Sequence, residues 1–170
     1  MNGHPGGAAH TRRMLALGAL APGSRVLDMG AGAGETVALL RGSGYDGVGL
    51  DLAPRGANVR TGDFLRTGFP DGSFDGVNSQ CAFYLSGDVP GALAESRRIL
   101  KTGGVLMLSD VFFEPPVPLL TRAGFSVLVC EDMTAQWRGY YLEAVWRGAA
   151  DGCRVPRGKC GYHLLIGRKE

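Results

Sequence analysis

Apolar residues along the chain fall into short runs that suit strands and longer periodic stretches that suit helices. The short runs cover 25–29, 46–50, 74–78, 105–111, 125–129 and 162–167, and each predicts a strand. A further short strand is predicted over 58–60, where it leads to Gly62-Asp63-Phe64. Helical spacing of apolar residues occupies 12–20, 35–41, 89–100 and 134–148. Strands that alternate with helices at this spacing predict an α/β domain, with a mainly parallel sheet covered by helices on both faces.

Small and polar residues indicate where these elements begin and end. Residues 1–9 are rich in glycine and are expected to be irregular, with Thr11 as the cap of the first helix. Gly103 and Gly104 follow the helix over 89–100 and are typical of a helix end. The proline-dense segment 114–118 is expected to be extended, and 119–123 allow about one helical turn.

Composition and charge exclude several kinds of partner. The chain has 170 residues, of which 45% are hydrophobic and 20% are charged, as in an ordinary soluble domain. Its formal net charge of +2 is too small to indicate a nucleic acid or a membrane surface as partner. No apolar run approaches the roughly 20 residues that span a bilayer, and residues 1–9 lack the layout of a signal peptide. A cytoplasmic location is therefore expected.

The cysteines are expected to be reduced thiols, because they are too few for a disulfide scaffold in a chain of this size. Cys153 and Cys160 lie close to His163 along the chain, Cys130 ends the preceding predicted strand, and four such ligands can in principle hold zinc. Six residues separate Cys153 from Cys160, which is not a recognised zinc spacing. Unligated thiols are therefore favoured, and no metal is predicted.

The stretch 26–37 turns from a strand into a helix through Gly30, Gly32 and Gly34. Such a turn leaves backbone N–H groups unpaired and lets a ligand approach the backbone, at the sheet edge where α/β proteins bind ligands. A phosphate-binding loop is excluded, because no Gly-Lys-Ser/Thr follows the turn. A dinucleotide is disfavoured, because Glu35 stands where the fingerprint has its third glycine, and Asp28 adds a second charge that would repel a pyrophosphate.

Three acids stand at the ends of three successive predicted strands. Asp28 precedes the glycine turn and suits a cationic group, such as the methionyl ammonium of S-adenosylmethionine. Asp51 ends the second strand, where a carboxylate can accept hydrogen bonds from both hydroxyls of a ribose. Asp63 follows the third strand and can accept from the adenine amino group. Any one of them can be an ordinary turn acid, but the three together favour a sulfonium cofactor over a dinucleotide.

These stretches resemble class I S-adenosylmethionine-dependent methyltransferases, in particular the small group related to ubiquinone and menaquinone biosynthesis. The matching motifs are Val-Leu-Asp-Met-Gly-Ala-Gly-Ala-Gly over 26–34, Gly-Leu-Asp-Leu over 49–52, Gly-Asp-Phe over 62–64, Phe-Pro-Asp-Gly-Ser-Phe-Asp over 69–75 and Arg-Arg-Ile-Leu-Lys-Thr-Gly-Gly over 97–104. They lie within 25–111, about half of the chain, in the order and spacing of the family.

The resemblance implies a Rossmann-like seven-stranded sheet, with the last strand (162–167) inserted antiparallel beside the strand over 105–111. It implies one methyltransferase domain over 1–170. This domain would comprise a cofactor-covering segment and helix (1–24), a cofactor-binding half (25–113) and a shortened acceptor-side half (114–170). It also implies S-adenosyl-L-methionine as cofactor, S-adenosyl-L-homocysteine as product and a small molecule as methyl acceptor. The cofactor-binding residues that it implies are Gly7, Thr11, Asp28, Gly30, Ala31, Gly32, Asp51, Leu52, Gly62, Asp63, Phe64, Gln80 and Cys81.

The acceptor is expected above the carboxyl ends of the strands over 74–78 and 105–111. Methyl transfer from a sulfonium is an in-line displacement, so the protein mainly needs to position the nucleophile and exclude water. A general base is needed only if the acceptor must first lose a proton. Asp110 and Tyr84 are the candidates for that catalytic role, with His10 third, although an ordinary strand-end acid is the favoured interpretation of Asp110.

The segment 113–123 is shorter than the region that covers the acceptor in most relatives. The pocket is then open, or the aromatic helix over 134–148 or a partner chain supplies a wall, as in a homodimer. The short segment also supports an alternative function, a non-catalytic S-adenosylmethionine-binding subunit that acts with a partner protein. The chain lacks an Asn-Pro-Pro-Tyr type motif and a basic patch with interleaved aromatics, which argues against nucleic acids and against amide or adenine N-methylation.

Overall fold

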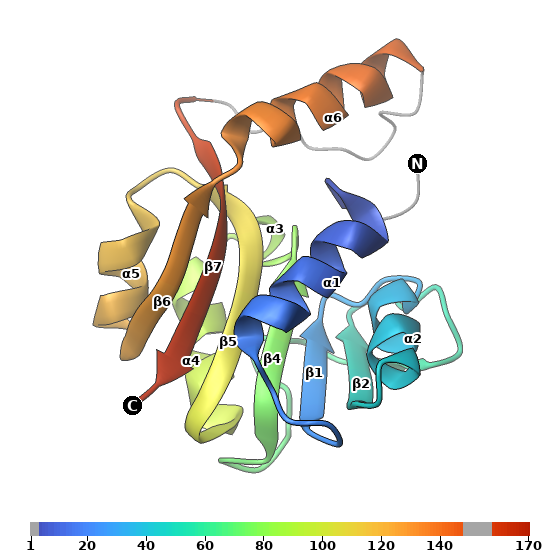
Figure 1. The fold of residues 1–170 in the computed structure, drawn as a ribbon, viewed down its shortest axis with the longest axis vertical. Helices are drawn as coiled ribbons and strands as arrows, with labels where there is room; N and C mark the ends of the chain where they lie inside the picture. The colour runs from blue at the N-terminus through green and yellow to red at the C-terminus, as the bar shows by residue number, and fades with distance from the viewer. Residues whose placement is uncertain (1–3, 148–157) are drawn as a thin grey trace.

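Seven strands form one sheet in the computed structural model, which describes residues 4–147 and 158–170 (Figure 1). They are β1 (Arg25–Met29), β2 (Asp46–Asp51), β3 (Val59–Thr61), β4 (Phe74–Gln80), β5 (Leu100–Phe112), β6 (Phe125–Asp132) and β7 (Gly161–Lys169). Their order is β3-β2-β1-β4-β5-β7-β6. Neighbours from β3 to β5 are parallel, whereas β7 is antiparallel to both β5 and β6. The predicted α/β fold and its reversed last strand are confirmed.

Helices cover both faces of this sheet, as the sequence predicts. They are α1 (Gly7–Gly18), α2 (Glu35–Gly42), α3 (Phe83–Ser86), α4 (Val89–Ile99), α5 (Pro116–Arg122) and α6 (Thr134–Trp146). Successive residues of β5 serve opposite cores, because side chains alternate across a strand. Met107 packs in the cluster that contains Met14 of α1, whereas Leu106 packs in the cluster that contains Leu93 of α4. This two-sided burial explains the continuous apolar run over 105–108 within β5.

The first helix begins earlier than predicted, at Gly7, so part of the segment expected to be irregular is helical. The prediction of Thr11 as its cap is wrong. Thr11 lies inside the helix, where its hydroxyl donates back to the Gly7 carbonyl at 3.5 Å. Gly6, with φ of 82°, occupies the N-cap position instead, in a left-handed conformation that glycine adopts at little cost.

The proline-dense segment is also different from its prediction. Pro116 begins α5, and Pro118 lies in its first turn, so residues 116–118 are helical rather than extended. Prolines are tolerated there because the N–H groups of a first helical turn have no acceptor within the helix. The four-residue helix α3 was not predicted, because four residues are too short for a periodic signal.

Residues 52–58 connect β2 to β3 without a helix. Parallel neighbours usually need a crossover of about a dozen residues or more, so this connection is unusually direct. It runs against the glycine turn, where the Arg55 N–H donates to the Gly32 carbonyl at 2.9 Å. A Cβ atom on Gly56 would lie only 2.1 Å from the Ala33 carbonyl oxygen, so only glycine permits this approach. The connection therefore places Arg55 beside the glycine turn.

The helix α6 contacts the sheet near its start and projects away from it further on (Figure 1). Trp137 is buried and its ring is parallel to that of Tyr162, with centroids 6.1 Å apart. Leu142 and Trp146 are 71% and 91% exposed, so these two apolar side chains further along the helix do not pack against the sheet. The predicted helix end at Gly148 lies outside the described residues.

Replacing Glu95 with glutamine is expected to lower the free energy of unfolding by about 1–2 kcal/mol at neutral pH. The Glu95 carboxylate accepts hydrogen bonds from the Thr67 N–H and hydroxyl and from the Arg98 guanidinium, which together hold its pKa at about 2. A depressed acid pKa stabilises the fold above the unfolded value of about 4.5, and this contribution disappears as the pH falls towards 2.

Urea titrations over this pH range test the prediction. The difference in the free energy of unfolding between wild type and Glu95→Gln should become smaller as the pH is lowered. Glu114→Gln, which breaks an exposed pair with Arg122, is the control and should change stability little. A gap of the same size at acid and neutral pH would contradict the assigned role of Glu95.

Candidate functional site

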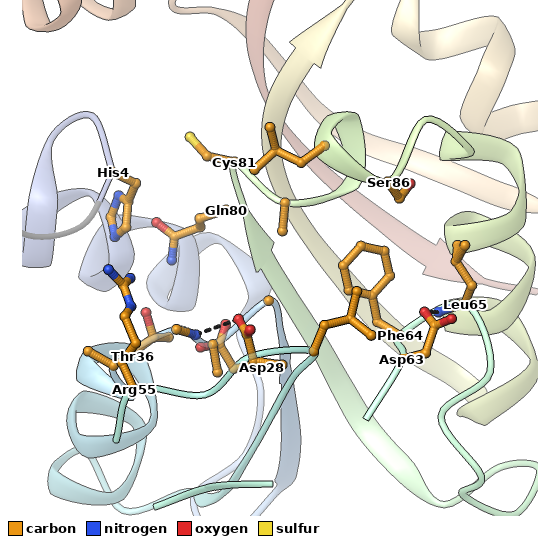
Figure 2. Close-up of a pocket in the computed structure, with 18 residues that line it drawn as sticks. His4, Asp28, Thr36, Arg55, Asp63, Phe64, Leu65, Gln80, Cys81 and Ser86 are labelled. Atoms are coloured by element: carbon orange, nitrogen blue, oxygen red, sulfur yellow. Dashed lines mark hydrogen bonds between the residues drawn. The ribbon is translucent and has the colours of Figure 1, made fainter. Parts of the chain in front are cut away.

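A cavity of about 520 Å³ opens at the carboxyl ends of β1, β2 and β4. The described residues that line it are His4, Asp28, Gly30, Ala31, Gly32, Ala33, Thr36, Asp51, Leu52, Arg55, Asp63, Phe64, Leu65, Gln80, Cys81, Ala82, Leu85 and Ser86. In Figure 2, Thr36 and Arg55 lie at one end, with Asp63 and Leu65 at the other, and Asp28 lies between them. The strand order reverses between β1 and β4, where a parallel sheet binds its ligands.

The glycine turn forms the floor of this cavity. Gly30 has φ of 80°, Gly32 of 52° and Gly34 of 84°, all in the left-handed region that side chains rarely adopt. The N–H groups of Gly30 and Ala31 donate to the Leu50 carbonyl at 2.9 and 3.1 Å, which holds the turn against β2. A Cβ atom on Gly30 would lie 2.3 Å from that of Ala82, so glycine is required there on steric grounds as well.

Asp28 lies at the centre of the cavity and is only 4% exposed. Its Oδ1 accepts a hydrogen bond from the Asn78 side chain at 2.7 Å. Burial raises the pKa of Asp28 to about 7, and the charge of Asp51 adds to this, whereas the Asn78 hydrogen bond opposes it. A buried carboxylate with little compensation has a strong electrostatic preference for a cationic ligand.

Asp51 and Asp63 are anchored by backbone N–H groups. Asp51 accepts from Gly32 at 2.8 Å and from Ala53 at 2.9 Å, one bond to each carboxylate oxygen. Asp63 accepts from Leu65 at 2.8 Å. Each carboxylate oxygen can accept two hydrogen bonds, so both acids keep acceptor capacity for a ligand while their orientation is fixed.

The structure brings together most of the residues that were predicted to bind a cofactor. Ten of them line the one cavity: Asp28, Gly30, Ala31, Gly32, Asp51, Leu52, Asp63, Phe64, Gln80 and Cys81. Three others, Gly7, Thr11 and Gly62, do not line it. Thr11 is 1% exposed, and its hydroxyl lies within hydrogen-bond distance of both polar atoms of the Gln80 side chain, at 3.2 and 3.4 Å. Thr11 therefore contacts a residue of the cavity wall without lining the cavity itself.

The candidates for a general base do not line the cavity either. Asp110 is buried, and its carboxylate accepts from the N–H groups of Tyr84 at 3.2 Å and Val111 at 2.7 Å. Burial raises the pKa of Asp110 to about 6, against the opposing backbone hydrogen bonds. This geometry fits an acid that fixes the start of α3, whereas the sequence favoured an ordinary strand-end acid and gave no sign of that helix.

His10, the third candidate, is also turned away from the cavity. Its Nε2 lies 2.9 Å from the Ser109 hydroxyl, and Ser109 in turn bonds to the Tyr162 hydroxyl. Burial, with the neighbouring charges of His4 and Arg13, lowers the pKa of His10 to about 4. His10 therefore stays neutral near pH 7 and serves this buried network.

Some residues of the cavity wall were not predicted. They are His4, Ala33, Thr36, Arg55, Leu65, Ala82, Leu85 and Ser86. Leu85 and Ser86 belong to the short helix α3, and Arg55 belongs to the direct β2–β3 connection, neither of which has a periodic signal. For two of them, the place in the sequence was a signal that could have been used. Thr36 lies in the first turn of the helix after the glycine turn, and Leu65 follows Asp63 by two residues.

Among residues 4–147 and 158–170, no group of three or more histidine, cysteine or acidic side chains is placed to hold a metal ion. Cys153, which entered the zinc alternative, lies outside the described residues. No helix in the described part of the chain is long and apolar enough to cross a membrane.

Residues 27–108 match a protein family described as a methyltransferase domain. The chain is 33% identical over 109 residues to the malonyl-[acyl-carrier protein] O-methyltransferase of Serratia marcescens, covering 58% of this chain and 43% of that protein. It is 36% identical over 131 residues to the demethylmenaquinone methyltransferase of Deinococcus radiodurans, covering 67% and 54%. The chain spans about half the length of the curated relatives it matches.

Solved structures share the fold over nearly the whole chain. The [4+2]-cyclase SpnF superposes with a TM-score of 0.73 at 21% identity, covering 94% of this chain and 79% of that one. A putative sarcosine dimethylglycine methyltransferase from Galdieria sulphuraria has a TM-score of 0.72 at 21% identity, with 95% and 84% covered. Identities this low establish the architecture only.

Proposed function

The chain belongs to the class I S-adenosylmethionine-dependent methyltransferases, and from that premise we propose that it moves a methyl group from S-adenosylmethionine to a small-molecule acceptor. The observation that carries the proposal is the placement of three acids and the glycine turn around one cavity. The fold by itself does not decide the reaction, since one structural neighbour is named as a cyclase. The names of the demethylmenaquinone methyltransferases among the sequence relatives support methyl transfer to a small molecule.

The donor set of the cavity fits this cofactor. Asp28 offers a buried carboxylate to the methionyl ammonium, and Asp51 offers acceptors to the two ribose hydroxyls. Asp63 lies at the far end, beside Phe64 and Leu65, where an adenine amino group has an acceptor and its ring has apolar contacts. Gly30 and Gly32 also line the cavity and present backbone without a side chain to it.

The chain contributes to methyl transfer mainly by positioning the methyl donor and the acceptor and by excluding water. When bound, S-adenosylmethionine supplies a methyl group that its positively charged sulfur exposes to direct attack. Gln80 and Cys81, at the end of β4, form the wall above Asp28, where an acceptor would approach (Figure 2). Because the carboxylate of Asp110 is occupied by backbone N–H groups, the proposal assigns it to positioning this wall through α3.

The affinity for S-adenosylhomocysteine is expected to fall below about pH 7, by up to about tenfold per pH unit. The pKa of Asp28 is raised to about 7, and only its ionised form attracts the ammonium. Protonation below this pH therefore competes with binding, and the affinity recovers as the pH rises through 7. Titration calorimetry between about pH 5.5 and 8 measures the profile, with Asp28→Asn as the variant that should be flat. A wild-type profile as flat as that of the variant would contradict the role of Asp28.

Methyl transfer is tested by incubating the chain with a labelled methyl donor and a metabolite extract. Label in a small molecule, dependent on the chain and absent with Asp51→Ala, is the expected result. Binding of S-adenosylhomocysteine is measured in parallel by calorimetry. A chain that binds neither S-adenosylmethionine nor S-adenosylhomocysteine would refute the proposed function.

A second candidate is a non-catalytic subunit that binds the cofactor and acts with a partner protein. The short connection between β5 and β6 favours it, because residues 113–124 contain only the seven-residue helix α5 to cover the acceptor side. This candidate predicts cofactor binding without label transfer to any extract fraction, together with one partner recovered at constant stoichiometry in a pull-down. Label transfer by the purified chain alone would exclude it.

A further inference from the structure

One end of the cavity carries a charge opposite to that of the rest. Asp28 lies at its centre and Asp63 at its far end, whereas Arg55 lies at the near end beside Thr36 (Figure 2). Asp51 is a third acid in the wall of this cavity. His4 lies above Arg55, and burial lowers its pKa, so it adds no positive charge at neutral pH. Arg55 is therefore the cation among the described residues of the cavity wall.

The position of the Arg55 side chain is set by the backbone on both sides of it. Its N–H donates to the Gly32 carbonyl at 2.9 Å, and the next residue, Gly56, touches the Ala33 carbonyl so closely that no Cβ atom fits. The guanidinium then passes over Gly32, where an added Cβ atom would lie 2.9 Å from Arg55 Nη2. The direct β2–β3 connection thus holds a cationic group over the glycine turn.

The guanidinium has no partner of opposite charge in the described chain. The ion pairs among residues 4–147 and 158–170 do not include Arg55. Asp51, the acid nearest to it along the chain, accepts from the N–H groups of Gly32 and Ala53 and forms no ion pair with Arg55. The first turn of α2 lines the same end through Thr36 and adds N–H groups that lack acceptors within the helix. Glu35 in that turn is exposed and does not line the cavity.

We propose that Arg55 binds the carboxylate of the methionyl group of S-adenosylmethionine, an inference that rests on the proposed function. The amino-acid part of this molecule carries an ammonium and a carboxylate on the same carbon. With the ammonium at Asp28, the carboxylate would need a cationic or N–H donor, and Arg55 and the first turn of α2 offer both kinds in the wall of the same cavity. The ammonium then faces Asp28 and the carboxylate faces Arg55. Arg55 therefore favours a ligand that carries the carboxylate over one that lacks it.

The test compares S-adenosylmethionine with its decarboxylated form, which keeps the sulfonium and the ammonium and lacks only the carboxylate. Calorimetry on the wild-type chain is expected to show about tenfold tighter binding of the intact compound. Arg55→Met should weaken binding of the intact compound about tenfold and leave the decarboxylated compound within about twofold of wild type. Arg12→Met is the matched control, because Arg12 is exposed on α1 and does not line the cavity.

The outcomes separate this inference from the function on which it rests. Equal wild-type affinity for both compounds overturns the role of Arg55 while leaving cofactor binding in place. An Arg55→Met variant that weakens both compounds alike also overturns it, since the side chain would then shape the cavity rather than bind the carboxylate. A wild-type chain that binds neither compound overturns the proposed function and this inference together.

Discussion

Replacing Asp51 with alanine is expected to weaken binding of S-adenosylhomocysteine roughly a hundredfold. The carboxylate ends β2 at the cavity, and its two oxygens are the acceptors available to a vicinal diol there. The substitution also removes the acceptor of the Gly32 N–H, which loosens the glycine turn and adds to the loss. Titration calorimetry measures the change.

Asp46→Ala provides the matched control for this substitution. Asp46 begins the same strand at its opposite end, is exposed and pairs with Arg25 at 3.4 Å. Its loss should leave the affinity within about twofold of wild type. Urea titration of both variants shows whether either change perturbs folding. An Asp51→Ala variant that folds like wild type and binds within about threefold of it would remove Asp51 from the site.

Replacing Gly30 with alanine is expected to lower the free energy of unfolding by about 3 kcal/mol and to abolish measurable cofactor binding. Two effects add at this position. A left-handed φ of 80° is costly for alanine, and its Cβ atom would lie 2.3 Å from that of Ala82. Ala82 lies at the start of α3, so relief of the clash moves the cavity wall itself. Urea titration and calorimetry measure the two effects.

Gly23→Ala separates backbone strain from the clash. Gly23 has φ of 81°, nearly that of Gly30, but a Cβ atom there would meet no atom within 4 Å. The Gly23→Ala substitution should lower the free energy of unfolding by about 1 kcal/mol, and the affinity for the cofactor should not change. Equal destabilisation by Gly30→Ala and Gly23→Ala would show that the contact with Ala82 contributes nothing.

The acids at the strand ends were predictable because strand position and chemistry coincide there. Asp28 and Asp51 follow apolar residues of a predicted strand, and Asp63 comes shortly after the short predicted strand over 58–60. All three acids then lie at the ligand-binding edge of a parallel sheet. Tertiary packing was not needed to place them. The reversed order of β7 and β6 was implied by the family resemblance and is confirmed.

Side-chain direction was not predictable in the same way. Asp110 also stands near the end of an apolar strand, and its sequence neighbourhood does not show where its side chain points. Its direction is set by α3, whose N–H groups it accepts, and that helix is too short to be seen from periodicity. Arg55 was not predicted, because its proposed role depends on how the β2–β3 connection packs against the glycine turn. That packing is visible only in the three-dimensional structure.

The place of β7 in the sheet has a consequence for biosynthesis. It is the last strand along the chain, yet it lies between β5 and β6 and pairs with both. The strands β1 to β5 can assemble as they leave the ribosome, whereas β6 emerges with no neighbour to pair with. Until β7 arrives, an apolar edge of β5 and the whole of β6 are open to wrong pairing. Folding of this chain is therefore expected to need protection, by a chaperone or by slow translation, at its final strand.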